Sequence, residues 1–369
     1  MAKVKHYSLD RILKEKAEYN VIYGERSNGK TTAILRYALE RYIASGYKDQ
    51  LAIIRRWEVD FKGKNGQQMF ENIVSLGWVE ELTKGIFNSI YYYSQRWWLI
   101  RYDENGEKQI QDVQPFAYGF SIASEEHYKS TSFPNIKIIF FDEFISRSYY
   151  LPNEFVLFQN LLSTIIRLRD DVQIFMAGNT INHYCPYIAE MGLTNVKKQK
   201  VGTIDVYSYG DEKNPLRVAV EYSGMDKSEK KSNKYFAFDN PKLRMITNGG
   251  WEIDIYPHLP VKYDKQEIKY IYYIKFDNEI LQCEIIKSKK INCWFTFIHR
   301  KTTPIKEDTK SLVFDTEQHV QHNYRIRLTT PSDDVSKRVA WFFKNEKVFY
   351  QDNDVGEMVR NYILWCSKN

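Results

Sequence analysis

Short apolar runs alternate with amphipathic segments through the first half of the chain. Four nearly continuous apolar runs predict buried parallel strands, because a strand covered on both faces shows no polar alternation. These runs span 19–23, 51–54, 136–141 and 172–177. Apolar residues recur at helical spacing over 31–42, a helix that Gly46 ends, and over 153–169, where Asn153 is the expected N-cap. Strands that alternate with helices predict a mostly parallel α/β sheet with crossover helices.

The stretch at about 60–130 interrupts this alternation. Residues 61–67 form a polar, glycine-containing segment that we expect to be a loop. Hairpin signals follow at 90–93 and 97–102, with an Asn105-Gly106 turn. The sequence therefore predicts a β-rich insertion that decorates the α/β core. Two more short strands are expected beyond it, at 203–209 and 216–222.

The composition changes again at residue 224, where Lys, Glu, Ser and Asn begin to dominate. Past residue 257, three runs predict a β-meander, at 268–276, 280–286 and 291–298. A helix, a strand and a final helix are expected at 332–344, 348–350 and 355–365. We therefore expect a first domain over 1–223, a linker over 224–255 and a smaller α+β domain over 256–369.

Charge and cysteine content narrow the class of protein. The 369 residues carry 53 Lys and Arg against 47 Asp and Glu, a formal net charge of +6 that permits a polyanion partner without requiring one. No apolar run is long enough to cross a bilayer, and the first 20 residues lack a signal-peptide core. The four cysteines show no metal-ligand spacing. We expect free thiols in a reducing compartment and no membrane partner, disulfide scaffold or zinc module.

Aromatic residues make up 15% of the chain, with 28 Tyr and 8 Trp. Core and hairpin packing is the favoured explanation for this excess. Base stacking is the alternative, and it would need aromatic side chains on an exposed basic face.

A phosphate-loop motif, GxxxxGK[ST], follows the first predicted strand and opens the first predicted helix. Backbone N–H groups of such a loop point at phosphate oxygens, and the helix N-terminus adds positive potential. Lys30 would reach the β- and γ-phosphates of a nucleotide, and Thr31 would bind Mg²⁺. The expected nucleotide-binding residues here are Gly24, Glu25, Arg26, Ser27, Asn28, Gly29, Lys30, Thr31 and Thr32.

Two acids, Asp142 and Glu143, follow the apolar strand at 136–141. At the carboxyl edge of a parallel sheet, Asp142 would hold Mg²⁺ and Glu143 would act as general base on the attacking water. The adjacent glutamate favours hydrolysis over transfer to an acceptor. Asn179 ends the next strand, where its amide could contact the γ-phosphate or orient the water. The alternative is a turn residue in Gly178-Asn179-Thr180.

Arg167 and Arg169 are expected at the carboxyl end of the helix over 153–169. Cations at that end complement the helix dipole. An arginine finger acting on a neighbouring subunit's nucleotide is the alternative, and the sequence leaves both open.

Taken together, these motifs resemble the DNA-packaging ATPases, or encapsidation proteins, of phi-29-like phages. The resemblance covers about the first 200 residues and is weak beyond residue 224. Besides the phosphate loop it rests on Arg55-Arg56, Lys129-Ser130, Phe133-Pro134-Asn135, Phe141 to Ile145, Pro152-Asn153-Glu154, Thr164 to Arg169 and Gly178-Asn179.

The resemblance implies an ATP- and Mg²⁺-dependent motor of the ASCE type of P-loop NTPase. It implies a ring, expected to be a pentamer, that drives double-stranded DNA into a prohead at its portal vertex in the host cytoplasm. It leaves open whether a packaging RNA takes part. By position, Glu143 would be the catalytic glutamate, Arg167 the trans-acting finger, Lys129 a second trans-acting cation, and Arg55 a nucleotide-side residue or a salt-bridge partner.

The tail of such proteins resembles a ribonuclease-H-type domain related to the nuclease of large terminases. Nuclease chemistry needs several clustered carboxylates, and the strand at 268–276 carries none in its middle. We therefore expect a vestigial nuclease that binds DNA or the portal without cutting.

Duplex DNA contacts are expected from pore-facing loops, and Lys62 and Lys64 are candidates unless their loop is merely solvated. A helicase-like ATPase on single strands, and a P-loop kinase or nucleotide-binding regulator, stay as alternative functions.

Overall fold

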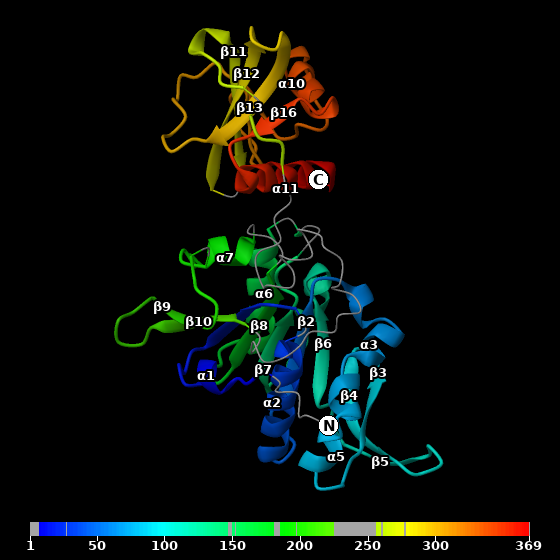
Figure 1. The fold of residues 1–369 in the computed structure, drawn as a ribbon. Helices are drawn as coiled ribbons and strands as arrows, with labels where there is room; N and C mark the ends of the chain where they lie inside the picture. The colour runs from blue at the N-terminus through cyan, green and yellow to red at the C-terminus, as the bar shows by residue number, and fades with distance from the viewer. Residues whose placement is uncertain are drawn as a thin grey trace. The chain divides into compact units, whose positions relative to one another are not determined.

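The computed structural model describes residues 7–26, 28–146, 150–151, 153–180, 185–196, 198–224, 256–259, 261–276 and 278–368. The chain divides into two compact units (Figure 1). The second unit holds Glu252–Asn369 with two short segments, Arg147–Pro152 and Asn182–Ala189, and the first unit holds the rest. The expected linker at 224–255 lies, apart from residue 224, outside the described residues, so the proposed domain boundaries stay a prediction.

The first unit is built on a ten-stranded sheet in the order β3-β4-β6-β2-β7-β8-β1-β10-β9, with β5 paired to β4. Six neighbouring strands of this sheet are parallel, which confirms the mostly parallel α/β architecture predicted from the apolar runs. These are β6 (Ala117–Ser121), β2 (Gln50–Arg55), β7 (Ile136–Asp142), β8 (Gln173–Asn179), β1 (Tyr19–Gly24) and β10 (Leu216–Ser223). The antiparallel additions are β3 (Ser89–Tyr93), β4 (Arg96–Tyr102), β5 (Lys108–Gln111) and β9 (Ile204–Tyr209).

Helix α2 (Lys30–Ala44) covers the centre of this sheet. Its buried side chains Ile34, Ala38 and Tyr42 belong to one apolar cluster with Ile53 and Phe140 of the strands. The remaining helices of the unit are α1 (Asp10–Leu13), α3 (Lys64–Gln68), α4 (Glu71–Ser75), α5 (Trp78–Leu82) and α6 (Glu154–Ile166), with 3₁₀ turns at Glu58–Phe61 and Ile122–Tyr128. Helix α7 (Pro186–Glu190) falls, except for Glu190, in the segment Asn182–Ala189 of the second unit. Nowhere in the described parts of the chain is a helix long and apolar enough to cross a bilayer.

The segment at 60–130 corrects one expectation. It is not a separate β-rich decoration, because β6 pairs in parallel with β2 and carries the central sheet outward to β4. The predicted loop at 61–67 contains helix α3, and Phe61 before it is fully buried against Trp97. Gly119 of β6 makes room for Phe61, since a Cβ there would lie 2.9 Å from the ring. This long-range packing folds a polar stretch that looks like a loop in sequence.

Helix α6 corrects two more expectations. It ends at Ile166, three residues before the predicted end, because Arg167 adopts a positive φ of 55°. Asn153 does precede the helix, but at φ 52° its side chain makes no capping hydrogen bond. Pro152, one of the residues that carry the resemblance, lies outside the described residues.

The second unit contains a six-stranded mixed sheet in the order β15-β14-β11-β12-β13-β16. The predicted meander is confirmed as β11 (Ile268–Phe276), β12 (Glu279–Ser288) and β13 (Cys293–Arg300). Parallel strands flank it, namely β14 (Val313–Phe314), β15 (Tyr324–Arg325) and β16 (Val348–Tyr350). Helix α10 (Asp334–Lys344), capped by the Asp333 carboxylate, and α11 (Asn353–Lys368) pack against this sheet in one apolar cluster.

Candidate functional site

The parallel strands bring the predicted phosphate loop and the predicted acids to one edge of the sheet. Strand β8 lies between β1 and β7, with Gly24 paired to Asn179 and Asp142 paired to Ala177. The carboxyl ends of β1, β8, β7 and β2 therefore lie side by side, where open α/β sheets bind their ligands. Segments separated by 111 residues in the chain meet there.

Two glycines shape the turn from β1 into α2. Gly24 has a φ of 147°, and a Cβ on it would lie 1.9 Å from the Ser223 carbonyl oxygen of β10. Gly29 precedes α2 in the left-handed region at φ 88°. Between them, the Asn28 amide donates to Ser223 Oγ at 3.0 Å, and the Thr180 N–H donates to the Gly24 carbonyl at 3.1 Å. Ser27 lies outside the described residues.

Lys30 is the first residue of α2 and only 5% exposed. Its ammonium donates to the Glu25 carbonyl at 2.6 Å, to Asn28 Oδ1 at 3.1 Å and to Asn179 Oδ1 at 3.4 Å. Burial lowers the pKa of Lys30 to about 8, although the negative charges of Asp142 and Glu25 act in the opposite direction. A cation surrounded mainly by neutral oxygens is suited to accept a strongly anionic ligand.

The side chains of Thr31 and Asp142 are in contact with each other. The Thr31 hydroxyl donates to Asp142 Oδ1 at 3.1 Å, and Asp142 is 9% exposed. Burial raises the pKa of Asp142, whereas Arg55 at 3.3 Å from Oδ2 lowers it. A hydroxyl and a carboxylate in contact are hard oxygen donors of the kind that Mg²⁺ prefers.

Glu143 follows directly in the left-handed region at φ 58°, with a side chain that is 66% exposed. Its Oε2 lies 3.0 Å from Arg55 Nη1, so one guanidinium at the end of β2 contacts both acids of the pair. The next N–H, of Phe144, donates to the Ala177 carbonyl at 3.2 Å and fixes the turn against β8. Arg55 therefore forms salt bridges with both acids, which is one of the two roles that the sequence left open. Its contact with a nucleotide stays a prediction.

A buried ion pair supports this turn and was missed by the sequence analysis. Arg56 Nε and Nη2 donate to Glu154 Oε2 and Oε1 at 2.7 and 2.8 Å, with Arg56 6% and Glu154 1% exposed. The same guanidinium donates to the carbonyls of Phe144 at 3.1 Å and Glu143 at 3.5 Å. The Arg55-Arg56 doublet was a signal, but Arg55 ends β2 and Arg56 follows it, and only the folded structure shows that the first contacts the two acids and the second contacts Glu154.

Arg167 and Lys129 lie elsewhere in the first unit. Arg167 is exposed and donates to the Thr131 carbonyl at 3.0 Å, close in sequence to Lys129, which is exposed and pairs with Glu126 at 3.4 Å. Arg169 donates to the Ile136 carbonyl at 2.5 Å, where β7 begins. Since β7 runs from Ile136 to Asp142, this Arg169 contact lies at the end of the strand away from the acids, roughly 20 Å along it.

The remaining predicted residues belong to the phosphate loop or to the segment at 61–67. Glu25 and Arg26 lie within the phosphate loop and Thr32 directly follows it, and all three are half-buried. Lys62 and Lys64 are exposed, and Lys62 pairs with Glu58 at 3.3 Å. Their proposed contact with DNA stays a prediction.

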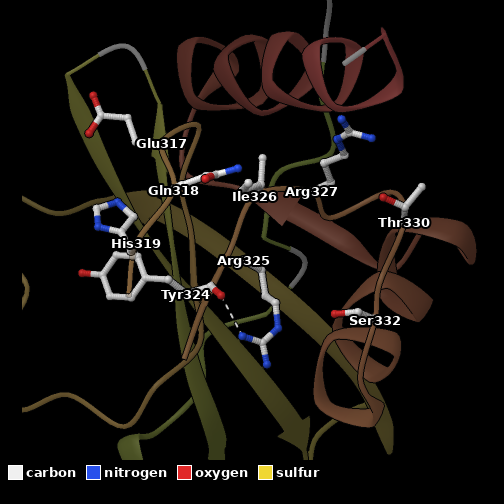
Figure 2. Close-up of a pocket in the computed structure, with 9 residues that line it drawn as sticks. All are labelled: Glu317, Gln318, His319, Tyr324, Arg325, Ile326, Arg327, Thr330 and Ser332. Atoms are coloured by element: carbon white, nitrogen blue, oxygen red, sulfur yellow. Dashed lines mark hydrogen bonds between the residues drawn. The ribbon is translucent and has the colours of Figure 1, made fainter. Parts of the chain in front are cut away.

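The second unit contains a pocket of about 440 Å³, and Figure 2 shows the residues that line it. Arg325 in this pocket donates to the Tyr324 carbonyl at 2.7 Å and to Asp333 Oδ2 at 2.6 Å. Asp315, which directly follows β14, is 4% exposed and contacts the Lys275 ammonium of β11 and His319 Nε2, the latter at 2.8 Å. Within the described ranges, no three His, Cys, Asp or Glu side chains converge as a metal site would require.

Comparison with known proteins agrees with this arrangement. The sequence model of the family described as Podovirus DNA encapsidation protein (Gp16) matches residues 106–208, which include β7, α6 and β8. A DNA packaging protein of Bacillus phage B103 is 26% identical over 189 residues, 50% of this chain and 50% of that protein. The chain thus spans about half the length of the curated relative it matches.

Two solved structures share the fold over nearly the whole chain. The bacteriophage Phi-29 viral genome packaging motor assembly has a TM-score of 0.60 at 16% identity, covering 97% of this chain and 99% of that chain. The Phi-28 gp11 DNA packaging motor has a TM-score of 0.55 at 18% identity, covering 98% of each. With the sequence matches, these structures confirm the predicted resemblance: the chain is similar to the phi29-like podovirus DNA encapsidation proteins in sequence over half of its length and in fold over nearly all of it.

Proposed function

We propose that this chain is an ATP-hydrolysing motor that moves double-stranded viral DNA into a prohead. The observation that carries the proposal is the contact between Thr31 and Asp142 at 3.1 Å, with the buried Lys30 ammonium beside them. The names of the relatives, a DNA packaging protein and a genome packaging motor assembly, support the coupling of that site to DNA.

Mg-ATP fits the donor set at this edge of the sheet. Lys30 would exchange its neutral oxygen partners for the β- and γ-phosphates, and Thr31 and Asp142 would hold Mg²⁺, with Asp142 acting through water. Bound Mg²⁺ would supply charge stabilisation at the phosphoryl oxygens. Glu25, Arg26, Ser27, Asn28, Gly29 and Thr32 complete the proposed phosphate loop, and the extra strand β8 between β1 and β7 supports the ASCE type.

Glu143 is the proposed general base. Its exposed carboxylate can reach a water molecule, but Arg55 Nη1 occupies the Oε2 oxygen at 3.0 Å. Hydrolysis would then require Arg55 to move toward the bound phosphates and release Glu143. We propose that Asn179, whose Oδ1 lies 3.4 Å from Lys30 Nζ, orients the attacking water or contacts the γ-phosphate.

Arg167 is the proposed arginine finger, acting on the nucleotide of a neighbouring subunit. Its guanidinium contacts the Thr131 carbonyl and it follows the end of α6 away from Glu154, which supports stabilisation of transition-state charge in trans. A head-to-tail ring, which we expect to be a pentamer at the prohead portal in the host cytoplasm, would provide that geometry. Lys129, two residues before the Arg167 contact, is a second proposed trans-acting cation.

The second unit is the proposed DNA- or portal-binding domain, with a ribonuclease-H-like architecture that the meander and its parallel flanking strands support. We propose that it does not cut DNA. In a metal-dependent nuclease the carboxylate after β14 would need acidic neighbours, and here Asp315 contacts the Lys275 ammonium instead. Lys62 and Lys64 are proposed contacts to duplex phosphates.

ATP hydrolysis by a Glu143→Gln variant tests this proposal. We expect the variant to bind Mg-ATP like the native protein and to hydrolyse it about 10²- to 10⁴-fold more slowly, because the base is lost and the binding groups remain. Glu104→Gln, an exposed acid between β4 and β5, is the matched control and should turn over normally. Native turnover should rise with duplex DNA. Stimulation by single strands only would favour a helicase-like ATPase, and dependence on a phosphate acceptor would favour a kinase.

A further inference from the structure

An apolar groove of about 750 Å³ crosses the second unit between α10 and the meander. Its floor is made by Ile285 of β12 with Val339 and Phe342 of α10, all buried. Trp294 of β13 and Trp341 of α10 line it and stay 41% and 44% exposed. An indole is costly to leave in water, so two of them on the walls of one groove indicate a surface that receives a ligand.

The rim of this groove is positively charged. Of the described residues that line it, four are cations and none is an acid, and the cations are Lys269, Lys337, Arg338 and Lys347. Asp334 offsets part of this charge through an exposed contact of 3.5 Å with Lys337. Exposed pairs of this kind contribute little, so the groove presents a net positive field. The complementary ligand carries negative charge outside and flat apolar groups inside.

Each exposed indole is accompanied by a lysine. The Lys287 ammonium lies 5.7 Å from the ring centre of Trp294, and the Lys347 ammonium lies 5.1 Å from that of Trp341. A flat ring stacked on the free part of either indole would have a cation within reach of an attached anionic group. A nucleotide has this combination of flat base and adjoining phosphate.

We propose that this groove binds unpaired nucleotides of a single-stranded nucleic acid, with bases stacked on Trp294 and Trp341 and phosphates held by the lysines of the rim. Duplex bases are already stacked on one another and cannot present their faces to side chains, so the ligand differs from the duplex that the motor would move. The proposal does not depend on the ATP site, which is built from other residues.

Binding of labelled oligonucleotides of about ten nucleotides to the full chain tests the proposal. Oligo(dT) and oligo(U) are compared, because the same stacking chemistry could come from DNA or RNA, and binding of either supports the groove. We expect Trp294→Ala and Trp341→Ala each to weaken binding by about tenfold, and the Phe variants at both positions to restore much of it. Trp98→Ala, a half-buried tryptophan of β4 in the first unit, is the matched control.

Salt dependence separates the two kinds of contact. The affinity should fall with salt with a logarithmic slope of roughly −2 to −3, and the double variant Lys269→Ala, Lys347→Ala should flatten it while the tryptophan variants leave it unchanged. Native affinity in both tryptophan-to-alanine variants, with their folding checked by circular dichroism, would overturn the proposal. So would loss in these variants of binding to an acidic amphipathic peptide but not to the oligonucleotides, which would assign the groove to a protein partner.

Discussion

At the scale of single residues, Lys30 is held in a charged form by surroundings that are poor at solvating it. It is 5% exposed, and its hydrogen-bond partners are a carbonyl and two side-chain amides. Burial in these surroundings lowers the pKa of Lys30 to about 8. The charge therefore becomes fully stabilised only when a polyanion arrives.

This lowered pKa predicts a pH dependence of nucleotide binding. Bound phosphates would raise the pKa of Lys30, so Mg-ATP binding takes up a proton wherever the free protein has lost one, and affinity falls as pH rises through 8. We expect roughly tenfold weaker binding at pH 9 than at pH 7, measured by titration calorimetry. A Lys30→Arg variant, which stays charged, should lack this decline. Equal native affinity at both pH values would show that Lys30 does not bind the phosphates.

Some site residues could be found from the sequence and others could not. Lys30 and Thr31 follow from the loop motif, and Asp142 from an acid at the end of an apolar strand, because both signals are local. The contact of Arg55 with both acids depends on β2 lying beside β7, which no spacing within either segment encodes.

At the scale of elements, one ion pair connects the end of β2, the turn after β7 and the start of α6. Arg56 and Glu154 are both buried and bonded through two parallel hydrogen bonds, and Arg56 also holds the carbonyls of Glu143 and Phe144. The pair thus fixes the positive-φ turn on which Glu143 stands.

Removing one partner of this pair should be costly. Glu154→Ala removes the carboxylate that neutralises the buried Arg56 charge, and we expect the free energy of unfolding to fall by about 3–5 kcal/mol, measured in urea. Glu40→Ala breaks the exposed Arg36–Glu40 pair on α2, which is 2.8 Å long, and should cost less than about 1 kcal/mol. If both variants lost similarly little stability, the buried pair would not support the turn.

The elements themselves were largely predictable, for a physical reason. Buried parallel strands and amphipathic helices carry their burial pattern in consecutive residues, and β1, β2, β7, β8 and α2 confirm it. The prediction for the region around α3 and β6 was wrong because residues there are buried by partners distant in the sequence. Phe61, which packs against Gly119, is an example. Strands of two residues, such as β14 and β15, are too short to show any period.

At the scale of the whole molecule, the direction in which α6 runs bears on the role proposed for Arg167, a trans-acting arginine finger. The helix starts at Glu154, whose carboxylate pairs with Arg56 beside the turn that carries Glu143, and Arg167 directly follows its other end. If Arg167 acts in trans, as proposed, a complete active site requires two subunits arranged head to tail.

Mixing two inactive variants tests this division of the site. Lys30→Ala subunits lack a working phosphate loop but keep Arg167, and Arg167→Ala subunits have the reverse defect. If Arg167 acts in trans, an equal mixture should recover basal ATP hydrolysis, to about a quarter of the native rate for random assembly. A mixture of Lys30→Ala with Glu143→Gln is the control, since both defects fall in the same subunit's site. An Arg167→Ala mixture as inactive as this control would contradict the trans role.

A single Mg-ATP site made by the loop after β1 and the acid end of β7 is tested most directly by a double-mutant cycle between Thr31 and Asp142. The measurement is Mg-ATP affinity of the native protein, Thr31→Ala, Asp142→Asn and the double variant. If Thr31 and Asp142 hold the same metal ion, each single substitution should weaken Mg-ATP binding strongly. The double variant should then bind Mg-ATP only slightly more weakly than the weaker-binding single variant. Fully additive losses, or native affinity in Asp142→Asn, would contradict the site.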